Sequence, residues 1–419
     1  MTMTEGSNHA IVYGASGLSG WALVDQLLSS YPCATTFSKV TAVTNRPLSL
    51  SESYWPKLDG RRELQLVSGI DLGRGNGATL ADALLQKVRD VRTITHIYYL
   101  LSVFRAIDDD IEEVAINRRM LQNVIDAHNL ICPNLQFVVF TGGTRGYGIY
   151  VPGGTFSPPL TEEMVHNLPP DYAKTVVYPA YRELLDAASE GKAWTWCEVC
   201  PDAIIGFTPN GSQFSLALHW AQYLSLYAYN HGVGRDERGT KAKAVEVPFP
   251  GNAAGASSLL SPVSSRSLAR FMIYASTHPE TCGRGQLFNV SDSETPCTYG
   301  GIWPQLARWF GLVGVGPIED SQASENSLKV GQLPPTHTLT PGEYVVEYQS
   351  IFAGCGRVNA VSRGVGAGRQ QLDSVGYWLT FNRQLSLKRL RETGFDEDRN
   401  PVEGWLESFA MFRRAGLIL

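Results

Sequence analysis

The chain has 419 residues, of which 43% are hydrophobic and 18% charged, and its formal net charge is −5. This length allows one large or two ordinary domains, and the composition is typical of a soluble globular protein with a sizeable core. The charge gives no reason to expect a nucleic acid or a membrane surface as a partner, and no apolar run approaches the roughly 20 residues that span a bilayer. The polar start has no apolar signal core, which predicts a cytoplasmic protein.

The chain begins with an apolar run that leads into a glycine-rich turn and an amphipathic segment. Residues 9–13 are the apolar run, residues 14–20 read Gly-Ala-Ser-Gly-Leu-Ser-Gly, and residues 21–28 have helical periodicity. The first glycine permits a tight turn, the second lets the backbone approach a diphosphate, and the third lets helix and strand pack closely. The free N–H groups of the first helical turn then face the anion. We therefore expect a dinucleotide site at Gly14, Ser16, Gly17, Leu18 and Gly20.

Strands and helices alternate through the first half of the chain. Strands are predicted at 39–44, 64–67, 94–101, 135–140 and 194–199, and helices at 80–88, 107–127 and 178–188. Strands separated by helices predict an α/β fold with a doubly wound parallel Rossmann sheet, whose strand ends share one ligand-binding edge. We expect an NADP-binding domain in residues 1–210, with residues 286–292 returning to the sheet.

The pattern is less regular in the second half of the chain, and residues 211–419 are predicted to form mainly a smaller α+β region that caps the cofactor edge and binds substrate. Helices are predicted at 214–229, 266–275, 302–310, 370–377 and 402–412, and strands at 245–249 and 286–290. Residues 232–240 are expected to form a loop, and residues 321–360 lack clear periodicity. The aromatic segment that starts at Phe214 is either built to enclose an apolar ligand or an ordinary core helix.

Several residues that follow predicted strands are candidate cofactor contacts. Arg46, within Asn45-Arg46-Pro47, stands where NAD enzymes usually have a carboxylate, and a basic residue there can pair with a 2′-phosphate. We therefore favour NADP over NAD, the alternative being a solvated loop arginine. Asp71 suits a contact with the adenine amino group, the alternative being a turn or helix-capping aspartate. The other candidates are Asn45, Leu72, Leu100, Leu101, Thr141 and Ile204.

A polar loop and the helix after it carry the candidate catalytic groups. Residues 141–148 read Thr-Gly-Gly-Thr-Arg-Gly-Tyr-Gly and end the fifth strand. Tyr178 and Arg182 are four residues apart on one helical face, and a cation near a phenol stabilises phenolate and makes the tyrosine a better proton donor. The alternatives are a packing tyrosine and a solvated arginine. Ser102, Phe104 and Tyr147 are candidate substrate contacts, and core packing is the alternative for the first two.

The seven cysteines form no disulfide framework. Cys197 and Cys200 have redox-like spacing, but they lie in a predicted strand, where residues three apart point to opposite faces. We expect two core thiols there and no metal site.

From Gly14 to the C-terminus the chain resembles the progesterone 5β-reductase/iridoid synthase branch of the extended short-chain dehydrogenases. The segments that carry the resemblance are 14–20, 45–47, 95–99, 117–124, 201–209, 288–292, 303–311, 375–378 and 394–395, of which 201–209 and 288–292 are specific. The resemblance implies an NADPH-dependent reductase that adds hydride to the β-carbon of an enone or enal, on an apolar, terpenoid- or polyketide-like metabolite. It also implies that a tyrosine matching Tyr178 holds the developing enolate oxygen.

One departure from the family bears on the chemistry. The family has a lysine within Thr-Gly-x-Lys-His-Tyr after the fifth strand, whereas this loop has an extra residue and no lysine, with Thr144 or Arg145 in that place. Arg145 or Arg182 would then supply the positive charge. The alternative is a redox-neutral isomerase or cyclase, which needs only shape and a polar anchor on the carbonyl. A cofactor-sensing binding protein is a third hypothesis, and a homodimer is compatible with the sequence.

Overall fold

The computed structural model describes residues 8–29, 31–33, 35–45, 48–57, 60, 62–101, 109–212, 214–233, 244–318, 328–334, 338–363 and 369–419. Three residues with predicted site roles, Arg46, Ser102 and Phe104, lie outside these ranges.

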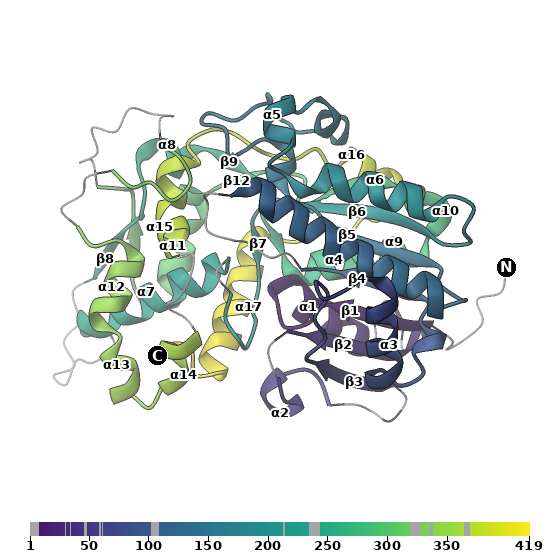
Figure 1. The fold of residues 1–419 in the computed structure, drawn as a ribbon. Coiled ribbons are helices and arrows are strands. Elements are labelled where there is room, and N and C mark those ends of the chain that lie inside the picture. Colours follow the sequence, from purple (N-terminus) through teal and green to yellow (C-terminus); the bar gives the residue numbers. More distant parts are fainter. Residues whose placement is uncertain are drawn as a thin grey trace.

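The larger part of the molecule is built on a seven-stranded sheet in the order β11-β6-β5-β4-β1-β2-β3 (Figure 1). The strands are β1 Asn8–Tyr13, β2 Phe37–Thr44, β3 Glu63–Ser68, β4 His96–Tyr99, β5 Phe137–Thr141, β6 Thr195–Pro201 and β11 Gln286–Val290. Every pairing between them is parallel; Ile11 of β1, for example, lies opposite Thr41 and Ile97. This confirms the predicted α/β Rossmann architecture.

Helices cover both faces of this sheet. On one face α3 Gly77–Lys87, α4 Asp110–Ile131 and α6 Val177–Ser189 pack side by side, and on the other α1 Leu18–Leu28 packs on α9 Ser265–Thr277. Neighbouring residues of β1 enter different cores, Ala10 one and Ile11 the other, because alternate residues of a strand point to opposite faces. Cys197 and Cys200 likewise lie in different clusters, which confirms that they point apart.

Helix α9 corrects the expectation that its segment belongs to the smaller region. It packs along α1 and against β5 and β6. Two side chains of β4 also contact its last turn: His96 Nε2 lies 3.2 Å from the Ser276 carbonyl oxygen, and the Tyr98 hydroxyl lies 2.7 Å from the Ser276 hydroxyl. The chain therefore returns to the sheet after it has entered the smaller region.

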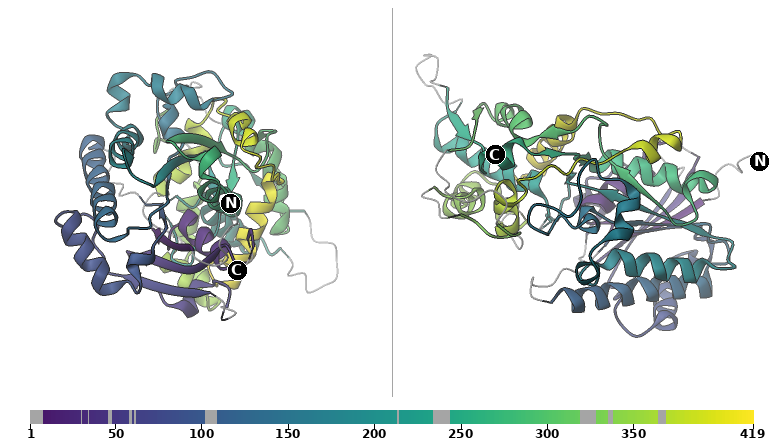
Figure 2. Two further views of the ribbon diagram at one scale, coloured as in Figure 1. Left: turned by 90° about the vertical axis from the view of Figure 1, so that its right-hand side faces the viewer. Right: turned by 90° about the horizontal axis from the view of Figure 1, so that it is seen from above.

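The smaller region lies beside the carboxyl ends of the strands rather than over a face of the sheet (Figure 1 and the right-hand view of Figure 2). It contains α7 Leu216–Asn230, β8 Glu246–Pro248, α8 Ala253–Ser257, α11 Tyr299–Trp309, β13 Val313–Val315, α12 Pro341–Tyr348, α13 Ser350–Gly354, α14 Val358–Arg363, α15 Arg369–Trp378 and α17 Pro401–Arg414. Trp220 of α7 stacks on Trp405 of α17 with ring centroids 5.1 Å apart. Trp220 is buried, so at this position the core-helix alternative for α7 is the one observed.

Helices α12, α13 and the start of α14 lie in the stretch of the sequence that lacks clear hydrophobic periodicity. Thr340 precedes α12 and forms a capping box with Glu343: the Glu343 amide lies 3.3 Å from the Thr340 hydroxyl, and the Thr340 amide 2.9 Å from a Glu343 carboxylate oxygen. Pro341 occupies the first helical position, where its missing N–H costs nothing. The helix is therefore defined by its start rather than by an apolar stripe.

Short elements complete the chain. They are α2 Leu50–Ser53, α5 Pro170–Ala173, α10 Pro279–Cys282, α16 Lys388–Glu392, β7 Ile204–Ile205, β9 Leu259–Leu260, β10 Val263–Ser264, β12 Cys297–Thr298 and 3-10 turns at Val91–Thr93, Thr144–Tyr147 and Glu162–Asn167. None of the helices in the described ranges combines the length and the apolar character needed to cross a bilayer.

Candidate functional site

The predicted glycine motif forms a tight turn between β1 and α1. Gly14 has a φ of +85°, and a Cβ added to it would lie 2.6 Å from the Leu100 carbonyl oxygen. A Cβ on Gly20 would lie 2.1 Å from the Gly14 carbonyl oxygen, so neither position accepts a side chain. Gly17 is the N-cap of α1 and provides no side-chain cap, which leaves the N–H groups of the first turn for an anion.

Other predicted cofactor contacts gather at the same edge of the sheet. The Leu100 amide bonds the Tyr13 carbonyl at 3.0 Å, and the Leu101 side chain would touch a Cβ on Gly14 at 3.1 Å. The Ser16 carbonyl accepts a hydrogen bond from the Thr208 hydroxyl at 2.6 Å. Thr141 ends β5 and Thr44 ends β2. The hydroxyl groups of both are buried and have no hydrogen-bond partner among the described residues.

The remaining predicted cofactor residues have local structural partners. Asp71 Oδ1 accepts from the Gly73 amide at 2.9 Å, which is the turn that the sequence offered as the alternative. The carbonyl of buried Leu72 accepts from Asn123 at 2.8 Å. Ile204 pairs with Val263 of β10, outside the main sheet. The choice between NADP and NAD stays a prediction, because Arg46 lies beyond the described residues.

Tyr178 is the second residue of α6 and lies against the loop that follows β5. A Cβ on Gly143 would lie 3.1 Å from the Tyr178 hydroxyl, and one on Gly146 would lie 3.1 Å from its ring. Burial raises the pKa of the Tyr178 phenol, and the Arg145 guanidinium opposes that shift. The phenol therefore stays protonated at neutral pH and can donate a hydrogen bond at this edge.

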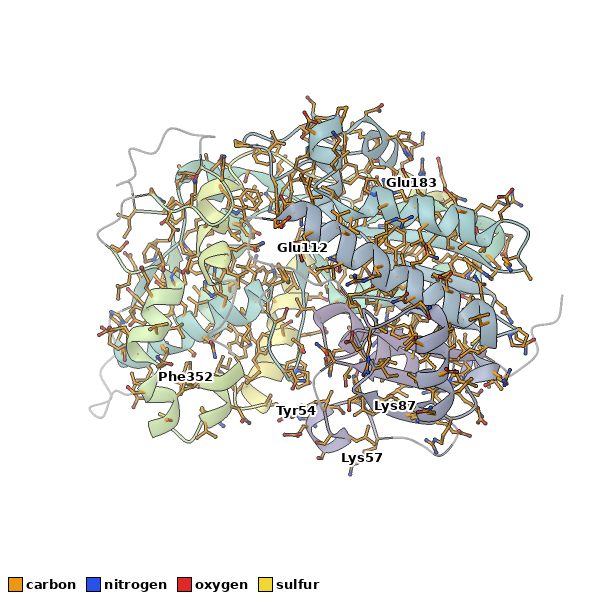
Figure 3. The ribbon with its side chains drawn as sticks, in the orientation of Figure 1. Tyr54, Lys57, Lys87, Glu112, Glu183 and Phe352 are labelled. Carbon is orange, nitrogen blue, oxygen red and sulfur yellow. The ribbon has the colours of Figure 1, made fainter. Side chains whose placement is uncertain are left out.

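Arg145 is held by acidic groups at the start of α4. Its guanidinium donates to Glu113 Oε1, Asp110 Oδ1 and the Thr175 carbonyl oxygen, each at 2.7 Å. Asp110 and Glu113 belong to the first turn of α4, where Glu112 is labelled in Figure 3, whereas Thr175 lies between α5 and α6. Arg145 is thus a positive charge near Tyr178, but two carboxylates neutralise it and its hydrogen bonds fasten the loop to α4.

Arg182 is likewise paired with a carboxylate, so the alternative of a solvated arginine does not hold, and its catalytic role stays a prediction. Its Nε lies 2.6 Å from Glu198 Oε2, and its Nη2 lies 3.2 Å from Glu198 Oε1. Glu198, on β6, was not predicted as a partner. A Cβ on Gly142 would lie 2.1 Å from Glu198 Oε1, so this ion pair underlies the loop that borders Tyr178.

Thr144 is connected to two further residues that were not predicted as site residues. Its hydroxyl donates to Asp202 Oδ1 at 3.0 Å, and Asp202 is also paired with Arg383 at an Nε–Oδ2 distance of 3.2 Å. Asp202 directly follows β6, whereas Arg383 lies in a segment to which no element was assigned. No local sequence signal marks this connection.

Two of the predicted substrate contacts, Tyr147 and Phe214, lie in the described part of the chain. Tyr147 is buried, and its hydroxyl donates a hydrogen bond to Asn289 Oδ1 at 2.7 Å, so its role as a substrate contact stays a prediction. Asn289 in turn donates to the Leu160 carbonyl at 2.9 Å. Phe214 is half-buried just before α7.

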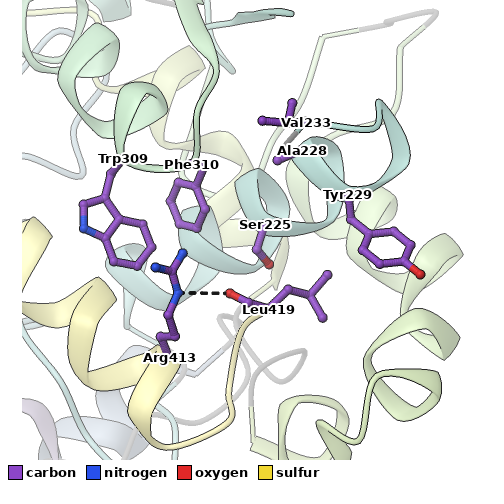
Figure 4. A pocket seen from close by; sticks show the side chains of 8 residues that line it. All are labelled: Ser225, Ala228, Tyr229, Val233, Trp309, Phe310, Arg413 and Leu419. Atoms are coloured by element: carbon purple, nitrogen blue, oxygen red, sulfur yellow. Dashed lines mark hydrogen bonds between the residues drawn. The ribbon is translucent and has the colours of Figure 1, made fainter. Parts of the chain in front are cut away.

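A pocket of about 200 Å3 lies in the smaller region (Figure 4). Its lining comes from the ends of α7, α11 and α17 and contains none of the predicted site residues: Ser225, Ala228, Tyr229, Val233, Trp309, Phe310, Arg413 and Leu419. Arg413 Nε lies 3.3 Å from the Leu419 carbonyl oxygen, and its guanidinium lies 3.9 Å from the Trp309 ring centroid. The pocket is therefore separate from the strand-end site.

Comparison with known proteins places the chain in a family. Residues 10–418 match the family described as PRISE-like Rossmann-fold domain. The short chain dehydrogenase ausT of Aspergillus calidoustus is 30% identical over 99% of this chain and 96% of its own. The (S)-8-oxocitronellyl enol synthase ISY1 of Nepeta racemosa is 24% identical over 96% of this chain and 92% of its own.

Solved structures support the fold alone. The UDP-N-acetylglucosamine 4-epimerase of Bacillus cereus has a TM-score of 0.57 at 14% identity, covering 97% of this chain and 100% of its own. The Bordetella bronchiseptica enzyme WbmH, in complex with NAD+, has a TM-score of 0.55 at 13% identity, covering 98% and 99%. With the family match over nearly every residue, the chain belongs to the PRISE family of short-chain dehydrogenase/reductase-like enzymes.

Proposed function

We propose that this protein is an NADPH-dependent reductase of an α,β-unsaturated carbonyl on an apolar, terpenoid- or polyketide-like specialised metabolite. The observation that carries the proposal is the position of Tyr178, a buried and protonated phenol against Gly143, at the sheet edge that also holds the glycine turn. Relatives named as short chain dehydrogenases and as an enol synthase support the same class of chemistry.

The residues at this edge fit a nicotinamide dinucleotide. The uncapped start of α1 suits the diphosphate, and Gly17 leaves the backbone open to it. The Thr44 and Thr141 hydroxyls are buried and lack partners among the described residues, so a bound ligand can satisfy them. NADPH, when bound, supplies the hydride.

The chain's own contribution would be to hold the carbonyl oxygen. Tyr178 donates a hydrogen bond to that oxygen, and the bond strengthens as negative charge develops there. The nearby Arg145 charge favours the anionic oxygen, although Asp110 and Glu113 reduce its effect. The glycines at 143 and 146 leave room for the phenol to reach this position.

The test is NADPH consumption with a panel of enones and enals, using Tyr178→Phe as the variant. We expect kcat to fall by roughly 10²–10³-fold while the Kd for NADPH stays unchanged, because only the hydrogen bond to the reacting oxygen is lost. Tyr227→Phe, on α7, is the matched control and should retain full activity. Failure of the protein to bind NADPH in calorimetry would reject the proposal.

A redox-neutral isomerase or cyclase is the second candidate. It is favoured by the finding that Arg145 and Arg182 are both paired with carboxylates, so neither is a free cation in place of the missing lysine. This candidate predicts turnover of substrate without net NADPH oxidation. Deuterium transferred from labelled NADPH into the product would eliminate it.

A further inference from the structure

The Asp202 carboxylate joins two segments that are far apart in the sequence. Its side chain is 4% exposed, and Oδ1 accepts a hydrogen bond from the Thr144 hydroxyl at 3.0 Å. Arg383 Nε donates to the same oxygen at 3.4 Å and lies 3.2 Å from Oδ2. Asp202 directly follows β6, so the carboxylate lies at the strand-end edge of the sheet. One buried carboxylate therefore holds both the loop after β5 and the segment that carries Arg383.

Arg383 extends this connection into the smaller region. Its backbone amide bonds the Leu259 carbonyl at 2.8 Å, and its guanidinium lies beside Tyr299, with Cζ 5.8 Å from the ring centroid. Burial raises the pKa of the Tyr299 phenol, and the charge of Arg383 and a hydrogen bond with it oppose that shift. Tyr299 begins α11 and packs edge-on against Trp220 of α7, with ring centroids 5.3 Å apart. Asp202 thus connects the loop to the aromatic core of the smaller region.

Residues 143–146 of this loop form the wall against which the Tyr178 phenol packs. A Cβ on Gly143 would lie 3.1 Å from the Tyr178 hydroxyl, and one on Gly146 would lie 3.1 Å from its ring. Thr144 lies within this wall, is buried, and uses its hydroxyl to bond Asp202. Because a protein interior is close-packed, a shift of the wall would move the phenol or leave it loosely held.

We propose that Asp202 is a positioning residue for the reaction: through the Thr144 hydroxyl it holds residues 143–146 in place, and these fix the Tyr178 hydroxyl that donates to the substrate carbonyl. The inference rests on the proposed function and deepens it. Thr144 acts through Asp202 and makes no contact with the substrate. A fixed wall lets Tyr178 meet the carbonyl oxygen without reorganisation.

Two changes at Thr144 separate the hydroxyl from the side-chain volume. Thr144→Val removes the hydrogen bond and keeps the volume, whereas Thr144→Ser keeps the hydroxyl. With the enone that turns over fastest, we expect Thr144→Val to lower kcat roughly tenfold, because a displaced phenol meets the carbonyl poorly, and Thr144→Ser to keep kcat within about twofold. The Kd for NADPH should stay unchanged in both. Thr277→Val, which removes a hydroxyl that bonds the Ile273 carbonyl at 3.0 Å on α9, is the matched control and should keep full activity.

Combination with Tyr178→Phe shows whether Thr144 acts through the phenol. We expect Thr144→Val to have no further effect on kcat in the Tyr178→Phe background, because no hydroxyl remains to be positioned. The pair Asp202→Leu with Arg383→Met removes both charges together with the acceptor of Thr144, and should likewise lower kcat only while the Tyr178 hydroxyl is present. If that pair does not fold, the Thr144 variants decide the inference.

An unchanged kcat in Thr144→Val, an equal loss in Thr144→Ser, or an equal loss with and without the Tyr178 hydroxyl would overturn the inference and leave the proposed function standing. Crystal structures of the variants give a readout that needs no turnover. The Tyr178 hydroxyl should move relative to Gly143 in Thr144→Val and stay in place in Thr144→Ser. If no enone is reduced, the proposed function fails, and an unmoved hydroxyl in Thr144→Val would then overturn this inference separately.

Discussion

The Arg182 guanidinium and the Glu198 carboxylate face each other beneath the loop after β5, with Nε 2.6 Å from Oε2. Arg182 is 13% exposed and Glu198 only 1%. Burial raises the pKa of the Glu198 carboxyl, and the Arg182 charge opposes that shift. The four-residue spacing from Tyr178, which suggested a catalytic cation, here places a structural ion pair below the site.

Removing one partner of this pair should be more damaging than removing both. We expect Arg182→Met to lower the free energy of unfolding by roughly 3–5 kcal/mol, because it leaves Glu198 buried and unpaired, and the double change Arg182→Met with Glu198→Leu to recover most of that loss. Urea denaturation measures both. A double variant that is stable but cannot turn over substrate would instead assign Arg182 a direct catalytic role.

Gly17 offers a test of the cofactor site that is separate from folding. Its φ of −84° is accessible to alanine, but an added Cβ would lie 3.3 Å from the Gly14 carbonyl oxygen, a tight contact, so urea denaturation of Gly17→Ala is measured beside cofactor binding to separate the two effects. The methyl group would meet a diphosphate approaching α1, and we expect the Kd for NADPH to rise roughly tenfold or more. Gly354→Ala is the control, since no atom lies within 4 Å of its added Cβ. An unchanged Kd in Gly17→Ala would count against the site.

His96 should make the stability depend on pH. Burial lowers its pKa to about 4, opposed by its hydrogen bond to the Ser276 carbonyl. In the unfolded chain His96 takes up a proton near its reference pKa of about 6.5, whereas in the folded protein it stays neutral to lower pH. Neutral His96 therefore contributes fully to the free energy of unfolding above about pH 6.5, and this contribution is lost as the pH falls toward about 4. The loss in the free energy of unfolding is on the order of 3 kcal/mol.

Unfolding free energies measured near neutral pH and near pH 4 check this expectation. His96→Gln keeps a donor for the Ser276 carbonyl but cannot titrate, so the difference between the two conditions should shrink in the variant. An equal pH dependence in both proteins would show that other groups produce it.

Cys33 should be the more reactive of the two exposed cysteines. Hydrogen bonds with the hydroxyls of Thr35, at 3.3 Å, and Thr36, at 3.1 Å, lower the pKa of its thiol to about 7. We therefore expect iodoacetamide at neutral pH to modify Cys33 before Cys355, as measured by peptide mass spectrometry. Thr36→Val should slow the modification of Cys33 and leave that of Cys355 unchanged.

The sheet and the glycine turn were predictable because their signals are local. The apolar strand, the glycines and the helix lie within residues 9–28, and their order fixes how they connect. The capping box at Thr340 and Glu343 is an equally local signal for α12, although the segment has no clear apolar stripe. Whether a segment forms a helix or a strand can therefore be predicted from residues close together in the sequence, when the residues that start a helix are considered as well as hydrophobic periodicity.

The partners of the site residues were not predictable, because they are distant in sequence. Tyr147 bonds Asn289, 142 residues away, and Arg383 pairs with Asp202 from the other half of the chain. A lone arginine or tyrosine gives no indication of which distant carboxylate or amide it will meet. The structure thus changed the assignments of side chains more than the assignment of the fold.

The return of the chain to the sheet at α9 and β11 means that the molecule has no single dividing point. A fragment ending near residue 210 would leave β6 as an unpaired edge and α1 without its packing partner, and such an edge invites association with other chains. Exchanging the smaller region between relatives would therefore require two junctions, one on each side of residues 263–290.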